Sequence, residues 1–262
     1  MNEYMSLIHE WNPKQAALKD ALSKPEWFGE AIQLCLELHG SVHPAEVSGA
    51  DTPTLFDELW RGLSRFSFET MPTEKDVTIA WNIWHITRIE DLTANILIAD
   101  NPQMLNDEWL GSLGTTVCDT GNAMTDGEIL SLSRSLDMDE LCAYRTAVGR
   151  RTRETVSNLS VADLKRKMKP ESVQRILAEG GVTEHKDSIW LLDFWGKKNV
   201  AGILLMPITR HQIMHISDSF KLKKEWQRNY EYADRTGNAG LDSKRRQFGR
   251  AYPCCQNGRL TR

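Results

Sequence analysis

Residues 81–97 read WNIWHITRIEDLTANIL, and this stretch decides the fold. Its large apolar residues recur at steps of three and four, the spacing of one α-helical face: Trp81, Ile89, Leu92 and Ile96. His85 falls on the same face. A histidine in a core position must satisfy both ring nitrogens or lose hydration. We therefore predict a long helix that begins near residues 73–76, ends at Asn101 and carries a functional histidine on its inner face.

Most other periodic segments also follow the helical period, and strand-like alternation is scarce. We expect helices over about residues 25–45, 54–63, 137–159, 161–168, 171–178 and 186–226, the last with a break near 196–199. Residues 110–127 should be irregular, and Pro207 should kink the last helix about one turn before His211. The predicted fold class is therefore all-α.

Composition narrows the function classes. The chain has 262 residues, 40% of them hydrophobic, which is enough for one sizeable core. Its formal net charge of −4 makes a nucleic-acid partner unexpected. No apolar run approaches the roughly 20 residues that span a bilayer, and the start lacks the order of a signal peptide. We expect a cytoplasmic protein with no membrane partner.

Five of the seven histidines fall on predicted inner helix faces. His211 and His215 are four residues apart, so their side chains lie about 5–6 Å apart at Cβ on one face. Both rings could then bind one ion at about 2.0–2.1 Å, with His85 as the third ligand. Three neutral ligands leave a position for water or substrate, as in catalytic sites. The spacing also permits histidines that are bonded to the backbone or to each other.

Two segments resemble the DinB/YfiT-like superfamily of metal-dependent enzymes: residues 81–97 and MPITRHQIMHISDS, residues 206–219. The resemblance implies a helical bundle with a four-helix core and additional short helices, often dimeric. It also implies an ion held by His85 from an early helix and by His211 and His215 from a late one. We predict a single DinB-like domain over residues 1–236 and a polar, loosely ordered tail over residues 237–262.

His39 and His43 form the second pair with four-residue spacing. They could supply a fourth ligand, act as a general base or proton shuttle, or form a separate site. They could also be partly hydrated residues at a helix end next to Pro44. If either ring faces the ion, it could deprotonate water or a thiol. His39 and His43 are therefore our candidate catalytic residues.

The leading hypothesis is a metal-dependent enzyme of the hydrolase or thiol-transferase type. It would use a divalent transition metal, zinc or nickel first, with a small-molecule substrate that could be a thiol, and could form a homodimer. The alternative is a non-catalytic stress-response or binding scaffold, whose histidines hold a structural metal or a hydrogen-bonded core. Nearby carboxylates could orient a ligand histidine or form surface ion pairs: Asp57, Glu58, Glu90, Asp91 and Asp218.

Overall fold

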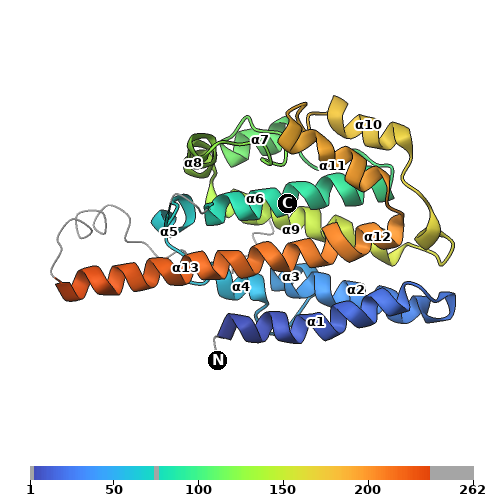
Figure 1. The fold of residues 1–262 in the computed structure, drawn as a ribbon, viewed down its shortest axis with the longest axis horizontal. Helices are drawn as coiled ribbons and strands as arrows, with labels where there is room; N and C mark the ends of the chain where they lie inside the picture. The colour runs from blue at the N-terminus through green and yellow to red at the C-terminus, as the bar shows by residue number, and fades with distance from the viewer. Residues whose placement is uncertain (1–2, 74–76, 237–262) are drawn as a thin grey trace, which may run out of the picture.

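The computed structural model describes residues 3–73 and 77–236, which form a helical bundle without a strand in those ranges (Figure 1). A single antiparallel bridge joins Lys167 and Asn199. The α-helices are α1 Glu3–Ala21, α2 Phe28–Ser41, α3 Ala45–Ser48, α4 Leu55–Trp60, α5 Arg65–Glu69, α6 Ile79–Glu90, α7 Asp107–Leu113, α8 Asp126–Ser135, α9 Met138–Ser157, α10 Pro170–Ala178, α11 Lys186–Gly196, α12 Val200–Leu205 and α13 His211–Thr236. Short 3-10 turns cover Pro25–Trp27 and Asp163–Lys165, and π-helical segments cover Asp91–Ile98 (η2) and Met206–Arg210 (η4). The all-α prediction is confirmed.

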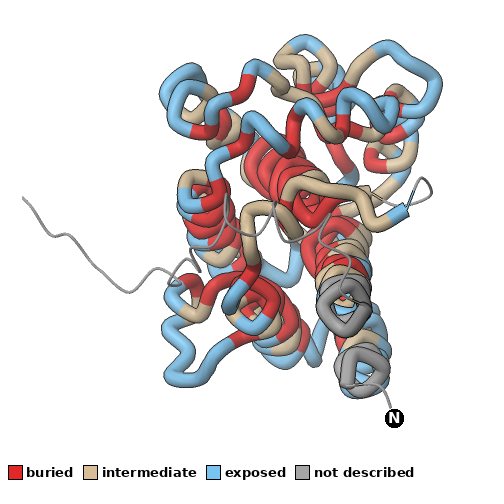
Figure 2. Tube along the Cα trace, turned by 90° about the vertical axis from the view of Figure 1, so that its left-hand side faces the viewer, coloured by how far each residue is buried: buried red, intermediate tan, exposed pale blue. Residues whose placement is uncertain are grey.

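Helix α6 and its π-helical continuation η2 form the centre of the bundle. Thr78 caps α6 by accepting from the Trp81 backbone N–H, and residues 82–98 are all buried. Figure 2 shows this buried helix surrounded by the others. Helices α13, α9, α5 and α8 pack against α6, and α9 and α10 pack against η2. The sequence predicted one inner face, but neighbours cover this helix on every side.

The predicted irregularity at Pro207 is present as the π-helical segment η4. Proline has no backbone N–H, so the hydrogen-bond ladder of an α-helix cannot continue through it. At the end of η4, the His211 N–H donates to the Met206 carbonyl, five residues back. The side chain of Gln15 in α1 donates to the Leu205 carbonyl at 3.0 Å, which gives a hydrogen-bond partner to a backbone oxygen directly before this segment. The irregular turn directly precedes the His211–His215 pair.

Several predicted boundaries need correction. The sequence prediction omitted α1, and it treated the region of α7 as irregular and omitted α8. The expected helix over residues 161–168 is wrong: only a 3-10 turn forms, and the chain then extends so that Lys167 pairs with Asn199 in an antiparallel bridge. The expected break near residues 196–199 is confirmed, since α11 ends at Gly196 and Asn199 caps α12.

Two further predictions concern the C-terminal tail and membrane-spanning segments. The proposed tail, residues 237–262, lies outside the described residues. Within the described part of the chain, none of the helices combines the length and apolarity needed to cross a bilayer.

Candidate metal centre

Helix α6 directs the ring of His85 toward α13. His85 is 3% exposed, and its Nδ1 lies 2.7 Å from the carbonyl oxygen of Thr120. A carbonyl can only accept a hydrogen bond, so Nδ1 must carry the proton. The neutral ring therefore presents the lone pair of Nε2, the form in which imidazole binds a metal ion.

His215 is fixed in the same way from the other helix. Its Nδ1 lies 2.7 Å from Oδ1 of Asn82, a buried residue of α6. The Asn82 oxygen accepts the Nδ1 proton and leaves Nε2 of His215 available. His211, one turn earlier on α13, has a buried Nδ1 without a hydrogen-bond partner. His211 and His215 are both partly exposed, so the site that they line reaches solvent.

The three rings of His85, His211 and His215, here called the triad, face one another. Their centroids lie 4.6, 4.8 and 5.1 Å apart, and one possible ligand atom from each lies within 4.8 Å of the other two. Two zinc–nitrogen bonds of about 2.1 Å span at most about 4.2 Å. A small rotation of the rings would therefore close the set around one ion.

The protonation of the triad suits a cation. Burial first, and then the neighbouring ring, lowers the pKa of each of the three histidines from 6.5 to about 3. The rings are therefore neutral at pH 7, as metal ligands must be. No hydrogen bond joins one triad ring to another in the described structure. This separates the triad from a core of mutually bonded histidines.

A tryptophan and a glycine hold His85 from its outer face. The Trp81 ring stacks on His85 at 4.5 Å with 10° between the planes, and its indole N–H donates to the Gly121 carbonyl at 3.2 Å. Gly121 has φ 77°, and an added Cβ would lie 2.6 Å from Trp81 Nε1. Only glycine allows the loop to adopt this conformation so close to the indole.

The comparison with known families agrees with this geometry. The model of the DinB superfamily matches residues 50–218, more than half of the chain. The chain belongs to the DinB superfamily. Among curated proteins, none matches this sequence. The part matched to the DinB superfamily includes the whole triad and Glu90, but it begins after His39 and His43.

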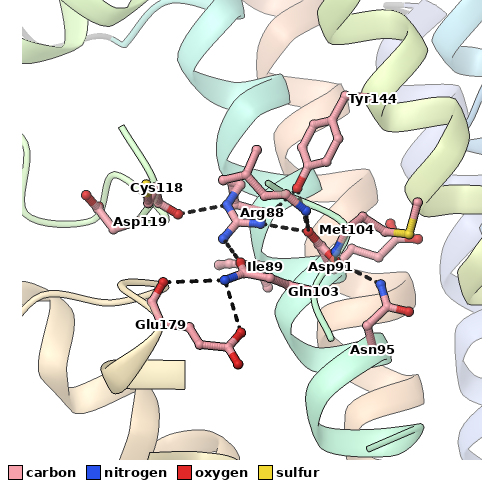
Figure 3. A network of polar contacts seen from close by, with 12 residues as sticks. Arg88, Ile89, Asp91, Asn95, Gln103, Met104, Cys118, Asp119, Tyr144 and Glu179 are labelled. Atoms are coloured by element: carbon pink, nitrogen blue, oxygen red, sulfur yellow. Dashed lines mark hydrogen bonds and ion pairs between the residues drawn. The ribbon is translucent and has the colours of Figure 1, made fainter. Parts of the chain in front are cut away.

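In this DinB superfamily protein, a buried ion pair fastens the Thr120 loop to α6. Arg88 donates to the Cys118 carbonyl at 2.9 Å and to the Asp91 carboxylate at 2.7 Å (Figure 3). Asp91 also accepts from the Tyr144 hydroxyl at 2.6 Å. Both charges are fully buried, so the expectation of a surface role for Asp91 is wrong. The Arg88–Asp91 pair thereby holds the loop that contains Thr120, whose carbonyl accepts the hydrogen bond from His85.

The structure separates the two groups of predicted site residues. It brings His85, His211 and His215 together, whereas His39 and His43 contact Glu90 instead. These two histidines are 1% and 0% exposed, so the alternative of a partly hydrated helix end is also wrong. Glu90 is fully buried and is not a surface ion-pair partner.

Three supporting residues were not predicted for this DinB superfamily site: Asn82, Thr120 and Gly121. Asn82 precedes His85 by almost one helical turn, so a search for polar residues on the buried face of α6 could have found it. Thr120 contributes a backbone carbonyl, which its side-chain type does not reveal. Gly121 lies in residues 110–127, which we predicted to be irregular but not to be part of the site.

Proposed function

We propose that this protein is a metal-dependent enzyme of the hydrolase or thiol-transferase type. His85, His211 and His215 would hold one divalent transition metal ion, zinc or nickel in the first place. The observation that carries the proposal is the convergence of three neutral rings, two of them with Nδ1 bonded to an acceptor, at a place that reaches solvent. When bound, the ion would act as a Lewis acid and lower the pKa of a water or thiol.

The protein's own residues would position the ligands and limit access. Thr120 and Asn82 hold the Nδ1 protons of His85 and His215, which fixes the orientation of both rings. Trp81 covers one face of His85. The partial exposure of His211 and His215 leaves a side from which a small-molecule substrate, such as a thiol, could approach.

A role for His39 or His43 as general base stays a prediction. His39 lies on α2 and His43 just beyond it, and both rings contact the Glu90 carboxylate. Their burial means that a proton exchanged with a substrate would have to cross the protein interior. These contacts favour a different role for the pair.

Metal content tests the triad directly. Protein made without a polyhistidine tag should lose one equivalent of metal in a His211→Ala, His215→Ala double variant. A His185→Ala variant is the matched control, because the side chain of His185 is 52% exposed and lies outside the triad. Equal metal content in the double variant and the wild type would overturn the proposed ligand set.

Cobalt substitution tests whether the site is open to a substrate. The visible spectrum of bound Co²⁺ should change when azide or a simple thiol is added, because either can enter a vacant position. A spectrum that no added ligand changes would indicate a closed site and favour the scaffold alternative. Hydrolysis and thiol-transfer assays of the zinc- and nickel-loaded protein would then separate the two reaction types, and sedimentation would show whether it is a homodimer.

A further inference from the structure

A second group of metal-binding side chains lies in the bundle interior, apart from the triad. His39 of α2, His43 just beyond it and Glu90 at the end of α6 are 1%, 0% and 0% exposed. We call them the buried cluster. One possible ligand atom from each lies within 4.8 Å of the other two. Two histidines four residues apart and one carboxylate make a donor set that suits zinc and related ions.

Both histidines face the same carboxylate. His39 Nε2 lies 2.8 Å from Glu90 Oε1, and His43 Nε2 lies 3.0 Å from Glu90 Oε2. The two rings stack at 4.0 Å with 24° between their planes. This arrangement directs two ring nitrogens and both carboxylate oxygens to one place.

Two facing atoms of the buried cluster have no donor or cation between them. His43 Nδ1 lies 2.9 Å from the His39 carbonyl oxygen, which can only accept, so Nδ1 carries a proton. Nε2 of His43 lies 3.0 Å from a carboxylate oxygen, and in the neutral ring it presents a lone pair to that oxygen. Apart from this contact with each other, neither Nε2 of His43 nor Oε2 of Glu90 has a polar partner, although both are buried. A cation between these two atoms would satisfy both.

The charged neighbour of the cluster leaves the carboxylate available. Arg145 of α9 donates to the Val42 carbonyl at 2.8 Å, to Thr87 at 3.1 Å and to Gln212 at 3.0 Å. Arg145 and Glu90 attract each other through space, but no hydrogen bond joins these two described side chains directly. The guanidinium therefore offsets the charge of Glu90 without occupying its oxygens. Its positive charge should make the cluster a weaker site than the triad.

Helix α9 closes the cluster from the remaining side. An added Cβ on Gly149 would lie 2.6 Å from Cδ2 and 3.2 Å from Nε2 of His43. Any residue other than glycine at position 149 would therefore clash with the His43 ring, because the backbone of α9 passes so close to it. Together with the burial of all three side chains, this leaves no room for a substrate.

We propose that His39, His43 and Glu90 bind a second divalent transition metal ion, in a closed structural site that joins α2 to α6. This ion would link the N-terminal part of the bundle, which precedes the residues matched to the DinB superfamily, to the central helix α6. The proposal does not depend on the function proposed for the triad. Because the site is closed, the ion should enter and leave only when the bundle opens locally, so it should exchange more slowly than the triad ion.

The test is Zn²⁺ binding to the full chain in a His211→Ala, His215→Ala background, which removes the triad. We expect two equivalents of Zn²⁺ in the wild type, one in this background and none when Glu90→Gln is added. A wild type that binds one equivalent and a background that binds none would overturn the second site. If wild type and background each bind one, the second site stands and the triad proposal fails.

Thermal melting in the same background distinguishes a metal from a shared proton. Glu90→Gln removes the charge that offsets the buried Arg145, so the metal-free variant should melt lower than its parent, and the informative quantity is the shift that Zn²⁺ produces in each protein. Zn²⁺ should raise the melting temperature of the parent and leave that of the Glu90→Gln protein unchanged. Glu154→Gln is the control, since Glu154 is 65% exposed, and it should keep the response to Zn²⁺. Equal responses of parent and Glu90→Gln would contradict the proposal.

Two further measurements keep the proposal testable if Glu90→Gln does not fold. Gly149→Ala should weaken Zn²⁺ binding at the cluster at least tenfold while every ligand is retained. Gly127→Ala should not, because an added Cβ at that helical glycine meets nothing within 4 Å. Anomalous diffraction at the zinc edge from wild-type crystals should show a peak between His43 and Glu90. A peak at the triad alone would overturn the proposal.

Discussion

His85 Nδ1 lies 2.7 Å from the carbonyl oxygen of Thr120, so a backbone atom 35 residues away determines which ring nitrogen can bind a metal. The same loop is fastened to α6 by the indole N–H groups of Trp81 and Trp84, which donate to the Gly121 and Asp119 carbonyls at 3.2 and 3.0 Å. The candidate metal centre thus depends on residues that are not themselves ligands.

Gly121→Ala should weaken metal binding through this loop. The new Cβ would clash with Trp81, which stacks on His85. Loss of a residue that orients a metal ligand typically lowers metal affinity by about 10–100-fold. Metal titration of the purified variant measures the change. Gly49→Ala is the matched control, because Gly49 has a similar φ of 70° but open space around an added Cβ. Both variants should be less stable, by about 1 kcal/mol or more, and only Gly121→Ala should lose affinity. Equal affinities would contradict a positioning role for the loop.

Tyr144→Phe should lower the free energy of unfolding by about 1–3 kcal/mol, because it removes a buried donor to a charged group. The Tyr144 hydroxyl donates to Asp91 at 2.6 Å and accepts from Arg88 at 2.8 Å. Urea denaturation provides the measurement. Trp190→Phe is the control, since Trp190 is 48% exposed, and it should change stability by less than about 0.5 kcal/mol. A Tyr144→Phe protein as stable as the wild type would show that the Arg88–Asp91 pair is adequately bonded without it.

The metal-free protein should become less stable as the pH falls below about 6.5. In the folded state burial lowers the pKa of the triad histidines, and that of His43, from 6.5 to about 3. Between these values the unfolded chain binds more protons, so stability rises with pH and is lost on acidification. The urea midpoint should fall between pH 6.5 and 5, above the range in which ordinary carboxylates titrate. Replacement of the triad by asparagine should flatten this slope, and an unchanged slope would be inconsistent with the lowered pKa values.

Cys35 should resist alkylation in the native protein. Burial first, and then the charge of Glu90, raises the pKa of its thiol to about 12, so the reactive thiolate is scarce at pH 8. Iodoacetamide labelling followed by peptide mass spectrometry should show modification of the partly exposed Cys118 but not of Cys35. After denaturation both should react. Rapid labelling of native Cys35 would show that α2 opens readily.

The sequence allowed the triad to be predicted because its signals are local. A four-residue spacing places His211 and His215 on one helical face, and an apolar stripe makes a polar residue such as His85 conspicuous. The supporting contacts of the site are not local. Thr120 acts through its backbone, so the chemistry of its side chain gives no sign of this role.

The errors in the fold also have physical causes. The burial of Glu90 and Asp91 was missed because periodicity identifies a preferred face but not a helix that is covered on all sides. Helix α1 contains Pro13 and lacks a strong apolar stripe, so its sequence gave little helical signal. Residues 161–168 contain helix-compatible residues, but Arg166 and Lys167 pair with the backbone at Asn199 and Val200, a distant contact that local periodicity does not reveal.

The π-helical segment Met206–Arg210 sets the direction of the histidine pair without contributing a side chain to the triad. A π turn holds one residue more than the α turn that it replaces, and each residue turns an α-helix by about 100°. Deleting Pro207 would remove both the extra residue and the missing N–H, and the regular helix so restored would rotate His211 and His215 away from His85. In this fold, the length of a single turn is as much a determinant of metal binding as the identity of the ligands.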